Sequence, residues 1–227
     1  MNIKTFTPKE KLPQGLIYPR QTHSANIIEI VTGQEDLSHT DGIWTTRKYD
    51  FILGVNTADC APIAFWNDER YGIIHSGWRG LCNGIIEDML EIFDPNLGTR
   101  ELKDLRTSSQ VPKFSSLSVE TPLLKEALVN VWVGPILPSF EIQKDFCYEI
   151  LEAKFGTAFF ETLPPDKGER SPSDQGGFLF HFQKALASLL PKNTQWDGRS
   201  TFDTPELGSW RRDKFLENNR NVTAIWP

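Results

Sequence analysis

The order of hydrophobic and polar positions predicts a chain of short strands with a few helices. Apolar runs of four to eight residues that end at Gly, Pro or polar clusters are typical of buried strands. Such runs occur at Ile27–Val31, Phe51–Asn56, Pro62–Phe65, Tyr71–His75, Val129–Val133 and Val222–Trp226.

Three other segments repeat apolar residues every three or four positions, as the buried face of a helix does. They are Asn83–Phe93, Lys144–Phe155 and Phe182–Leu190. In the first, the apolar stripe is best explained as core packing. In the second, the pattern predicts that Phe146, Ile150 and Leu151 are buried.

Two polar segments lie between these elements. Asp94–Lys125 is rich in Ser, Thr and charged residues and has no apolar period, which is typical of a lid, an insertion or disorder. Leu163–Gly177 contains several Pro and Gly residues and indicates another loop. Neither segment looks like a domain boundary, and the chain has no internal repeat. We therefore expect one domain over residues 1–227, with a polar insertion around 94–125.

Charge and cysteine content limit the classes of partner. With 24 basic and 30 acidic residues the net charge is −6, and no basic run is present, so polymeric nucleic acid and an anionic membrane are not expected partners. No run approaches the ~20 apolar residues that span a bilayer, and Met1–Glu10 lacks the apolar core of a signal peptide. Three widely spaced cysteines argue against a disulfide framework. These features predict a cytoplasmic protein, and they leave its oligomeric state open.

The strand at Tyr71–His75 ends on an unusual combination of residues. His75 closes the apolar run, and Gly77 and Gly80 follow, with a tryptophan and Arg79 between them. Glycines at this point allow a ligand to approach the main chain closely. The imidazole is either a core histidine bonded to a carbonyl or part of a binding site.

Two more candidates lie upstream at strand ends. Cys60 follows Asp59 in a polar break between two apolar runs, and Pro62 is expected to prevent a regular central ladder there. A free cysteine is by default a small buried hydrophobe, but its place beside an aspartate at a kink is unusual for packing alone. His23 lies in a polar loop before the strand at Ile27–Val31.

Together, His23, Cys60 and His75 suit a site assembled from separate strands. Their wide spacing differs from the closely paired cysteines of a structural zinc knuckle. Three protein ligands with an open fourth position are typical of catalytic zinc sites, and imidazole with thiolate favours zinc, or copper where it is available. The same residues also suit a Cys–His nucleophilic pair with an accessory histidine. Spacing does not separate these two interpretations.

The chain resembles the YfiH-like proteins, also called laccase-domain or multicopper polyphenol oxidase proteins. The resemblance rests on six motifs in the family's order, from about residue 18 to the C-terminus. They are Gln21-Thr-His23, Asp41-Gly-Ile-Trp-Thr45, Ala58-Asp-Cys60-Ala-Pro62, His75-Ser-Gly-Trp-Arg-Gly80, Gly134-Pro-Ile-Leu-Pro-Ser-Phe-Glu141 and Gly208-Ser-Trp-Arg-Arg-Asp213.

The resemblance implies an α/β (α+β) fold with α/β/β/α layers and mixed sheets. It also implies a zinc site at His23, Cys60 and His75, with copper as the other candidate metal. The laccase label implies copper and phenol oxidation, but three ligands do not furnish a multicopper cluster. The implied activity is phosphorolysis of adenosine, inosine or methylthioadenosine with phosphate, together with adenosine deamination. A bacterial branch of the family implies an alternative, an amidase that edits peptidoglycan precursors of the UDP-muramoyl-serine type.

Other polar residues complete the predicted site. Arg79 is expected to bind phosphate or to brace its turn, and Arg212 is a second candidate for phosphate. If the segment is extended, only one of Arg211 and Arg212 enters a pocket. Asp59 is predicted to orient a ligand histidine or to cap the kink, and we include it among the catalytic residues.

Only Met1–Arg20 precede Gln21, fewer residues than in the family, which motivates a third hypothesis: a metal-binding protein without turnover.

Overall fold

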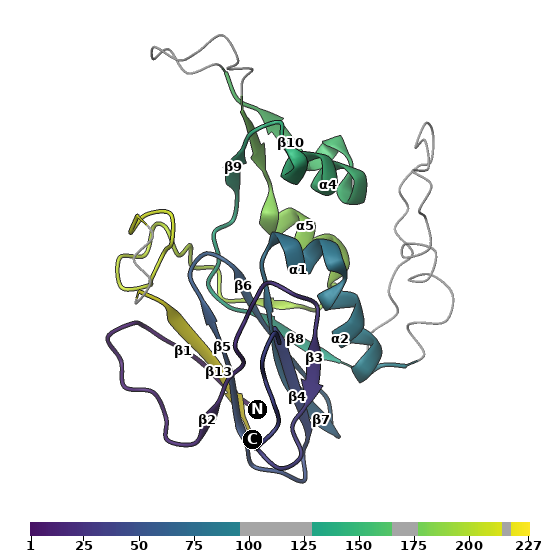
Figure 1. The fold of residues 1–227 in the computed structure, drawn as a ribbon, viewed down its shortest axis with the longest axis vertical. Coiled ribbons are helices and arrows are strands. Elements are labelled where there is room, and N and C mark those ends of the chain that lie inside the picture. The colour runs from purple at the N-terminus through teal and green to yellow at the C-terminus, as the bar shows by residue number, and fades with distance from the viewer. Residues whose placement is uncertain (96–128, 165–176, 215–218) are drawn as a thin grey trace.

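The computed structural model describes residues 1–95, 129–164, 177–214 and 219–227 (Figure 1). Its largest sheet has six strands in the order β12-β8-β6-β7-β4-β3. The strands are β3 (Ile27–Glu29), β4 (Gly42–Thr46), β6 (Ala61–Trp66), β7 (Arg70–Ser76), β8 (Asn130–Val133) and β12 (Gln195–Trp196). The sheet is mixed, because β3–β4 and β8–β12 pair in parallel and the other neighbours are antiparallel.

A four-stranded sheet packs on one face of this sheet. It consists of β1 (Asn2–Phe6), β13 (Asn221–Trp226), β5 (Ile52–Thr57) and β2 (Leu16–Ile17), in that order. Successive residues of a strand point to opposite faces. Ile73 of β7 therefore packs with Leu53 and Ile225 of the four-stranded sheet, whereas the neighbouring Ile74 packs on the helical side.

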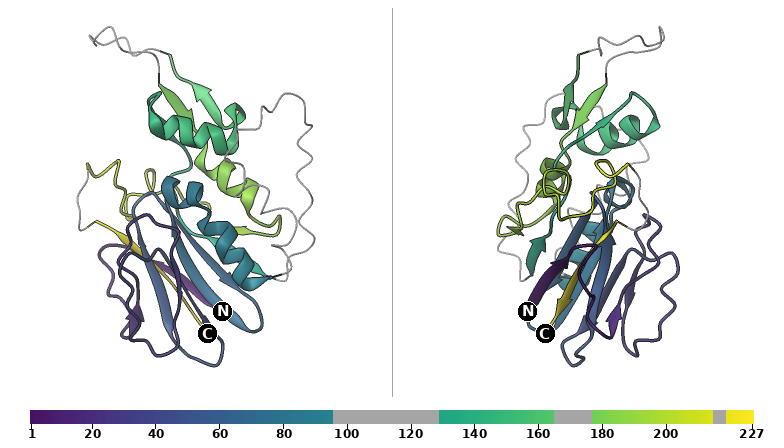
Figure 2. Two further views of the ribbon diagram at one scale, coloured as in Figure 1. Left: turned by 45° about the vertical axis from the view of Figure 1, so that its right-hand side comes forward. Right: turned by 90° about the vertical axis from the view of Figure 1, so that its left-hand side faces the viewer.

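Helices cover the other face of the six-stranded sheet, as Figures 1 and 2 show. α1 (Trp78–Asn83) and α2 (Ile85–Phe93) follow β7 directly and pack against it. The sequence predicted one helix over Asn83–Phe93, and α2 confirms most of it, whereas α1 was not predicted. Gly84 has a φ of 89° and separates the two helices. A residue without a Cβ adopts this left-handed conformation at no steric cost. The turn lets both short helices bury apolar residues against the sheet.

A small three-stranded sheet with two helices lies beyond this layer. Its strands are β9 (Phe140–Ile142), β10 (Phe160–Thr162) and β11 (Phe178–Phe180), and its helices are α4 (Phe146–Phe155) and α5 (Phe182–Leu189), with a 3-10 turn at Thr157–Phe159. Leu151 of α4 is buried as predicted, but Phe146 is 57% exposed and Ile150 43%. The prediction for these two residues was wrong, because Tyr148 packs instead against the rings of Phe160 and Phe178.

The predicted strands are all present, with ends shifted by one or two residues. The mixed α+β class and the layered mixed sheets are confirmed, while the second helical layer is not seen among the described residues. Pro62 was expected to prevent a regular ladder at this point, but it lies within β6. The expected insertion at Asp94–Lys125 falls almost wholly outside the described residues. None of the helices in the described ranges is long and apolar enough to cross a membrane.

Candidate metal site

His23, Cys60 and His75 converge in the structure. One ligand atom from each residue lies within 4.8 Å of the other two, and Cys60 Sγ is 3.9 Å from His23 Nε2. The two imidazole rings meet edge to face, with centroids 4.8 Å apart. His75 is 3% exposed, whereas His23 and Cys60 are half-buried. Within the part of the chain that the structure describes, this is the one such group that suits a metal ion.

Strand pairing brings the three segments together. Cys60 is the last of the three residues between β5 and β6, and Pro62 pairs with His75 near the end of β7. His23 and Asp59 both have positive φ, 62° and 87°, a conformation that is uncommon for residues with a Cβ. Such backbone conformations persist only where the surroundings fix them, and they cluster at functional sites.

Asp41 fixes the two histidines. Its carboxylate accepts hydrogen bonds from the main-chain N–H groups of Thr22, His23 and Ser24 at 2.7–3.1 Å, and from the Ser24 hydroxyl. It also accepts one from His75 Nδ1 at 2.8 Å. Bonding at Nδ1 leaves Nε2 of His75 for the cluster. A carboxylate behind a metal-binding imidazole sets its tautomer and orientation.

Gln21 and Gly77 complete the geometry around His23. The Gln21 side chain donates to and accepts from the main chain of Asn56 at the end of β5, so it ties the His23 loop to the other sheet. Gly77 packs directly on the cluster: a Cβ there would lie 2.9 Å from His23 Cδ2 and 3.0 Å from Cys60 Sγ. Glycine is therefore required where the chain passes the two side chains.

Burial and charge shift the pKa values of the cluster. Burial works against ionisation of Asp41, but hydrogen bonds from His75, Ser24 and Thr22 outweigh it and lower its pKa to about 2. Burial likewise disfavours a thiolate at Cys60, yet His75 and His23 lower its pKa to about 6. Against its own burial, His75 has its pKa raised to about 9 by Cys60 and Asp41. Both pKa shifts favour a thiolate at Cys60 and an imidazolium at His75 in the metal-free cluster.

This donor set fits a metal ion such as zinc. Two imidazole nitrogens and one thiolate are soft and borderline ligands, and the thiolate is already favoured at neutral pH. The glycine that packs against them keeps the space between the ligands free of side chains. Metal binding requires His75 to lose its proton, so it competes with protonation of that imidazole.

Asp59 does not contact either histidine, contrary to one of the roles expected for it. Its carboxylate accepts hydrogen bonds from the Thr201 hydroxyl at 2.7 Å and the Arg211 N–H at 2.9 Å. Asp41 has the position behind a ligand that the sequence suggested for Asp59. The only signal for Asp41 was its place in the Asp41–Thr45 motif, which did not reveal its partner.

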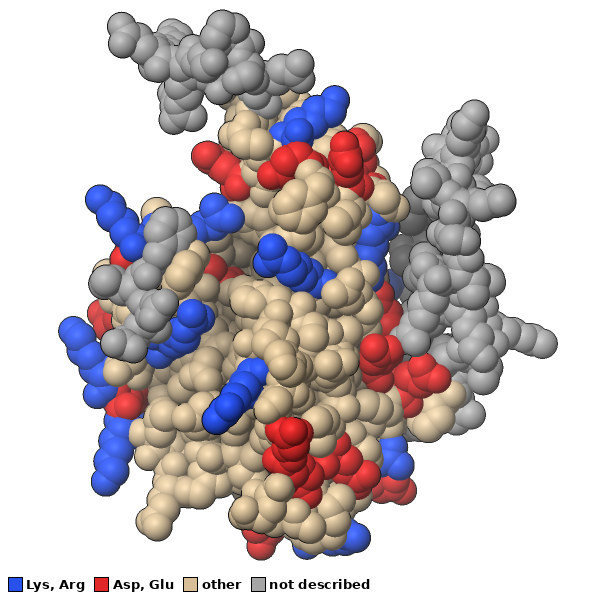
Figure 3. Space-filling model, viewed as in Figure 1, with Lys and Arg blue, Asp and Glu red and all other residues tan. Residues whose placement is uncertain are grey.

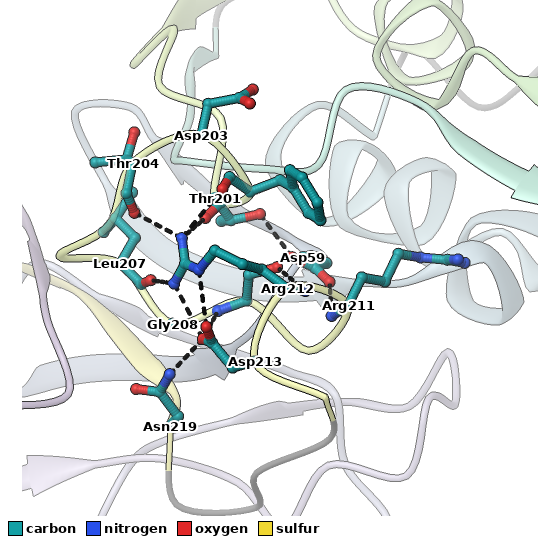
Figure 4. Close-up of polar contacts among 12 residues, drawn as sticks. Asp59, Thr201, Asp203, Thr204, Leu207, Gly208, Arg211, Arg212, Asp213 and Asn219 are labelled. Carbon is teal, nitrogen blue, oxygen red and sulfur yellow. Dashed lines mark hydrogen bonds and ion pairs between the residues drawn. The ribbon is translucent and has the colours of Figure 1, made fainter.

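Arg79, Arg211 and Arg212 differ in whether other residues already occupy their guanidinium groups. Arg79 is exposed, lies 4.6 Å over the Trp78 ring, and has no hydrogen bond or ion pair with another described residue. The Arg212 guanidinium is enclosed by main-chain carbonyls and Asp213 (Figure 4). Arg212 therefore stabilises its own loop. The sequence had suggested that it binds phosphate, but its donors are already occupied. The Arg211 side chain extends away from that enclosure and lies over the Phe140 ring.

The chain is similar to a known family model and to named proteins. The family model described as "Multi-copper polyphenol oxidoreductase laccase" matches residues 1–106, which include all three candidate ligands. A protein named purine nucleoside phosphorylase from Aquifex aeolicus is 28% identical over 99% of this chain and 87% of its own length. One of the same name from Haemophilus influenzae is 34% identical over 40% of this chain and 38% of its own.

Solved structures share the fold. The Bacillus licheniformis hypothetical protein YfiH superposes with a TM-score of 0.65 at 17% identity, covering 93% of this chain and 74% of that one. The matched family model, the relatives' names and this fold agree with the resemblance to the YfiH-like, laccase-domain proteins. The family's name suggests metal binding, and the His–Cys–His group is where the structure provides for it.

Proposed function

We propose that this protein is a zinc-dependent purine nucleoside phosphorylase that acts on adenosine, inosine or methylthioadenosine. The observation that carries the proposal is the convergence of His23, Cys60 and His75 in a chain whose relatives are named purine nucleoside phosphorylase. The compartment we propose is the cytoplasm, where thiols stay reduced, because all three cysteines are free.

His23, Cys60 and His75 would hold the zinc ion. When bound, zinc supplies a Lewis acid that polarises a phosphate or water oxygen. Asp41 keeps the His75 ring oriented and its Nδ1 protonated, so that Nε2 remains the ligand atom. The half-buried His23 and Cys60 mark the side of the cluster from which a small molecule approaches.

Arg79 is the residue we propose for phosphate. Arg79 lies two residues after Gly77, which packs against the cluster. The five N–H donors of its guanidinium group have no acceptor among the described residues. In phosphorolysis a phosphate oxygen attacks C1 of the ribose, the glycosidic C–N bond breaks, and its electron pair leaves with the base. A guanidinium that binds two phosphate oxygens orients the nucleophile for this attack.

The hydrogen bonds of the buried aspartates Asp41 and Asp59 favour phosphorolysis over adenosine deamination. Deamination at C6 of adenine needs a proton carrier, usually a carboxylate. Asp41 and Asp59 both already accept from main-chain N–H groups and from a neighbouring side chain. We therefore propose deamination as the slower of the two reactions.

The test is an assay of the zinc-loaded protein with each nucleoside, with and without phosphate. Phosphate-dependent release of free base is the expected result, and chromatography of hypoxanthine released from inosine measures it. Arg79→Gln should raise the KM for phosphate while leaving zinc content unchanged. Zinc bound at one equivalent without release of any base would contradict the enzymatic proposal and leave a metal-binding protein.

A second candidate function is amide hydrolysis by Cys60. The observation in its favour is the sequence of contacts from the low-pKa Cys60 through His75 to Asp41, which resembles a nucleophile, a base and an orienting carboxylate. A muramoyl-serine precursor is the substrate we propose for this activity.

Chelation separates the two candidates. A metal-dependent phosphorylase loses turnover when zinc is removed and regains it when zinc is restored. A cysteine hydrolase keeps its turnover after exhaustive chelation, and alkylation of Cys60 by iodoacetamide in the metal-free protein abolishes it.

A further inference from the structure

Arg212 organises the loop formed by residues 199–213. Its guanidinium donates to four main-chain carbonyls and to both oxygens of the adjacent carboxylate, so all three of its nitrogens have acceptors (Figure 4). These acceptors are Thr201 O (2.7 Å), Thr204 O (2.9 Å), Phe202 O (3.2 Å), Leu207 O, and Asp213 Oδ1 and Oδ2 (2.8 and 3.0 Å). One side chain thus ties together both arms of the loop.

The loop is partly buried and is joined to the four-stranded sheet. Thr201 and Ser209 have no exposed surface, and Leu207 is 1% exposed. The side chain of Asn221, the first residue of β13, both donates to and accepts from the main chain of Gly208. The loop is therefore fixed to a strand and is not a free surface segment.

This loop forms hydrogen bonds to Asp59, the residue before Cys60. The Thr201 hydroxyl donates to Asp59 Oδ1 and the Arg211 N–H donates to Oδ2, so one arm of the loop reaches each carboxylate oxygen. The main-chain carbonyl of Asp59 accepts from Leu137 N–H at 3.0 Å. Asp59 has a φ of 87°, which a residue with a Cβ keeps only when its surroundings hold it.

We infer that the loop at residues 199–213 positions the Cys60 ligand through Asp59, and that Arg212 and Thr201 are positioning residues of the metal site. The inference rests on the proposed role of Cys60 as a ligand. Without the two hydrogen bonds from the loop, the Asp59 backbone relaxes to an ordinary conformation and turns the Cys60 side chain away from His23 and His75. The histidine ligands have no bond to this loop, because Asp41 fixes them separately.

The test uses the full chain with Co²⁺ in place of zinc, because a thiolate ligand gives cobalt a charge-transfer absorption that imidazole does not. Arg212→Met removes the contacts within the loop, and Thr201→Val removes one bond to Asp59 with little change of shape. Arg199→Gln is the matched control, since Arg199 is the first residue of the loop and its ion pair with Asp197, just before the loop, does not reach Asp59.

Both positioning variants are expected to bind Co²⁺ about 10–100-fold more weakly, the range found when supporting partners of metal ligands are removed. The thiolate band per bound cobalt should fall in both. Arg199→Gln should match the wild type in both measurements. An undiminished thiolate band in Arg212→Met and Thr201→Val would overturn the inference.

Amide hydrogen exchange on the metal-free proteins gives a readout that does not depend on metal. Exchange at residues 58–61 should accelerate in both positioning variants, while residues 22–27 keep the wild-type rate. Equal acceleration in both segments would mean general destabilisation and would also overturn the inference. If the wild type binds no cobalt, the proposed metal function fails, and the exchange result alone decides the positioning role.

Discussion

The histidine half and the cysteine half of the candidate metal site are held in different ways. Asp41 supports the histidine half by direct contact, because it bonds the His75 ring and the His23 main chain. Asp59 supports the cysteine half without touching a ligand side chain, and its partners lie 142 and 152 residues further along the chain. One half is thus assembled from neighbouring strands and loops, and the other depends on the C-terminal part of the chain.

This difference has a consequence for the order in which the site forms. The partners of Asp41 lie within 34 residues of it, so short loop closures suffice to bring them together. The contacts of Asp59 require the C-terminal loop to be in place. The histidine half is therefore expected to persist under conditions that already disturb the cysteine half.

The largest expected effect comes from removing the cysteine ligand itself. Cys60→Ser should reduce zinc affinity by more than about 100-fold, beyond the 10–100-fold typical of supporting residues, because a hydroxyl is largely protonated and a poor ligand. Competition with a chromophoric chelator measures the affinity. Cys147→Ser, outside the cluster, is the control and should bind zinc like the wild type.

Breaking the histidine half should cost somewhat less affinity. Asp41→Asn keeps the shape but replaces one acceptor oxygen by an NH₂ group that faces N–H donors, so the His75 ring and the His23 loop lose their fixed positions. Zinc affinity is expected to fall about 10–100-fold, as measured by the same competition. A variant that binds zinc as tightly as the wild type would show that Asp41 has no supporting role.

The metal-free histidine half should also contribute to stability in a pH-dependent way. The pKa of Asp41 is about 2 in the folded protein, below its ordinary value of 3.8. Its contribution is therefore complete above about pH 5 and is lost as the pH falls through about 2, on the order of 2 kcal/mol in total. Urea unfolding across this range should show a smaller loss of stability in Asp41→Asn than in the wild type. Equal slopes would contradict the lowered pKa.

Gly77→Ala changes the residue that packs against both His23 and Cys60. The added Cβ would approach both His23 and Cys60 within about 3 Å, so the two ligands must move apart. We expect a roughly tenfold loss of zinc affinity, equivalent to about 1.4 kcal/mol. Gly177→Ala is a suitable control, because the nearest atom would be 3.4 Å from its Cβ. Unchanged zinc affinity in Gly77→Ala would mean that the cluster has more room than the structure shows.

The sequence pointed to the three residues that converge, but not to the residues that hold them in place. His23, Cys60 and His75 stand at strand ends in recognisable motifs, and the strands themselves follow the apolar pattern. The tasks of Asp59 and Arg212 depend on hydrogen bonds between the centre of the chain and its C-terminus, which no local pattern contains. Asp41 was likewise missed because its role consists of contacts across loops.

The fold shows the same limit in its peripheral elements. Strands with strong apolar runs were predicted, but β1 and β2 were not. β1 is a partly exposed edge strand with few apolar residues, and β2 is an edge strand of only two residues. In α4 the buried face was misplaced because the small sheet packs on Tyr148 and not on Phe146. In both cases the partner surface determined burial, and the partner is not encoded in the local period.

Zinc X-ray absorption of the reconstituted wild-type protein tests the metal site most directly. We expect one zinc ion per chain with one sulfur at about 2.3 Å and two imidazole nitrogens at about 2.0–2.1 Å. Thr201→Val should lower the sulfur contribution and leave the imidazole contribution in place. A wild-type spectrum without sulfur, or with nitrogen and oxygen ligands only, would contradict the assignment of His23, Cys60 and His75 as the metal ligands.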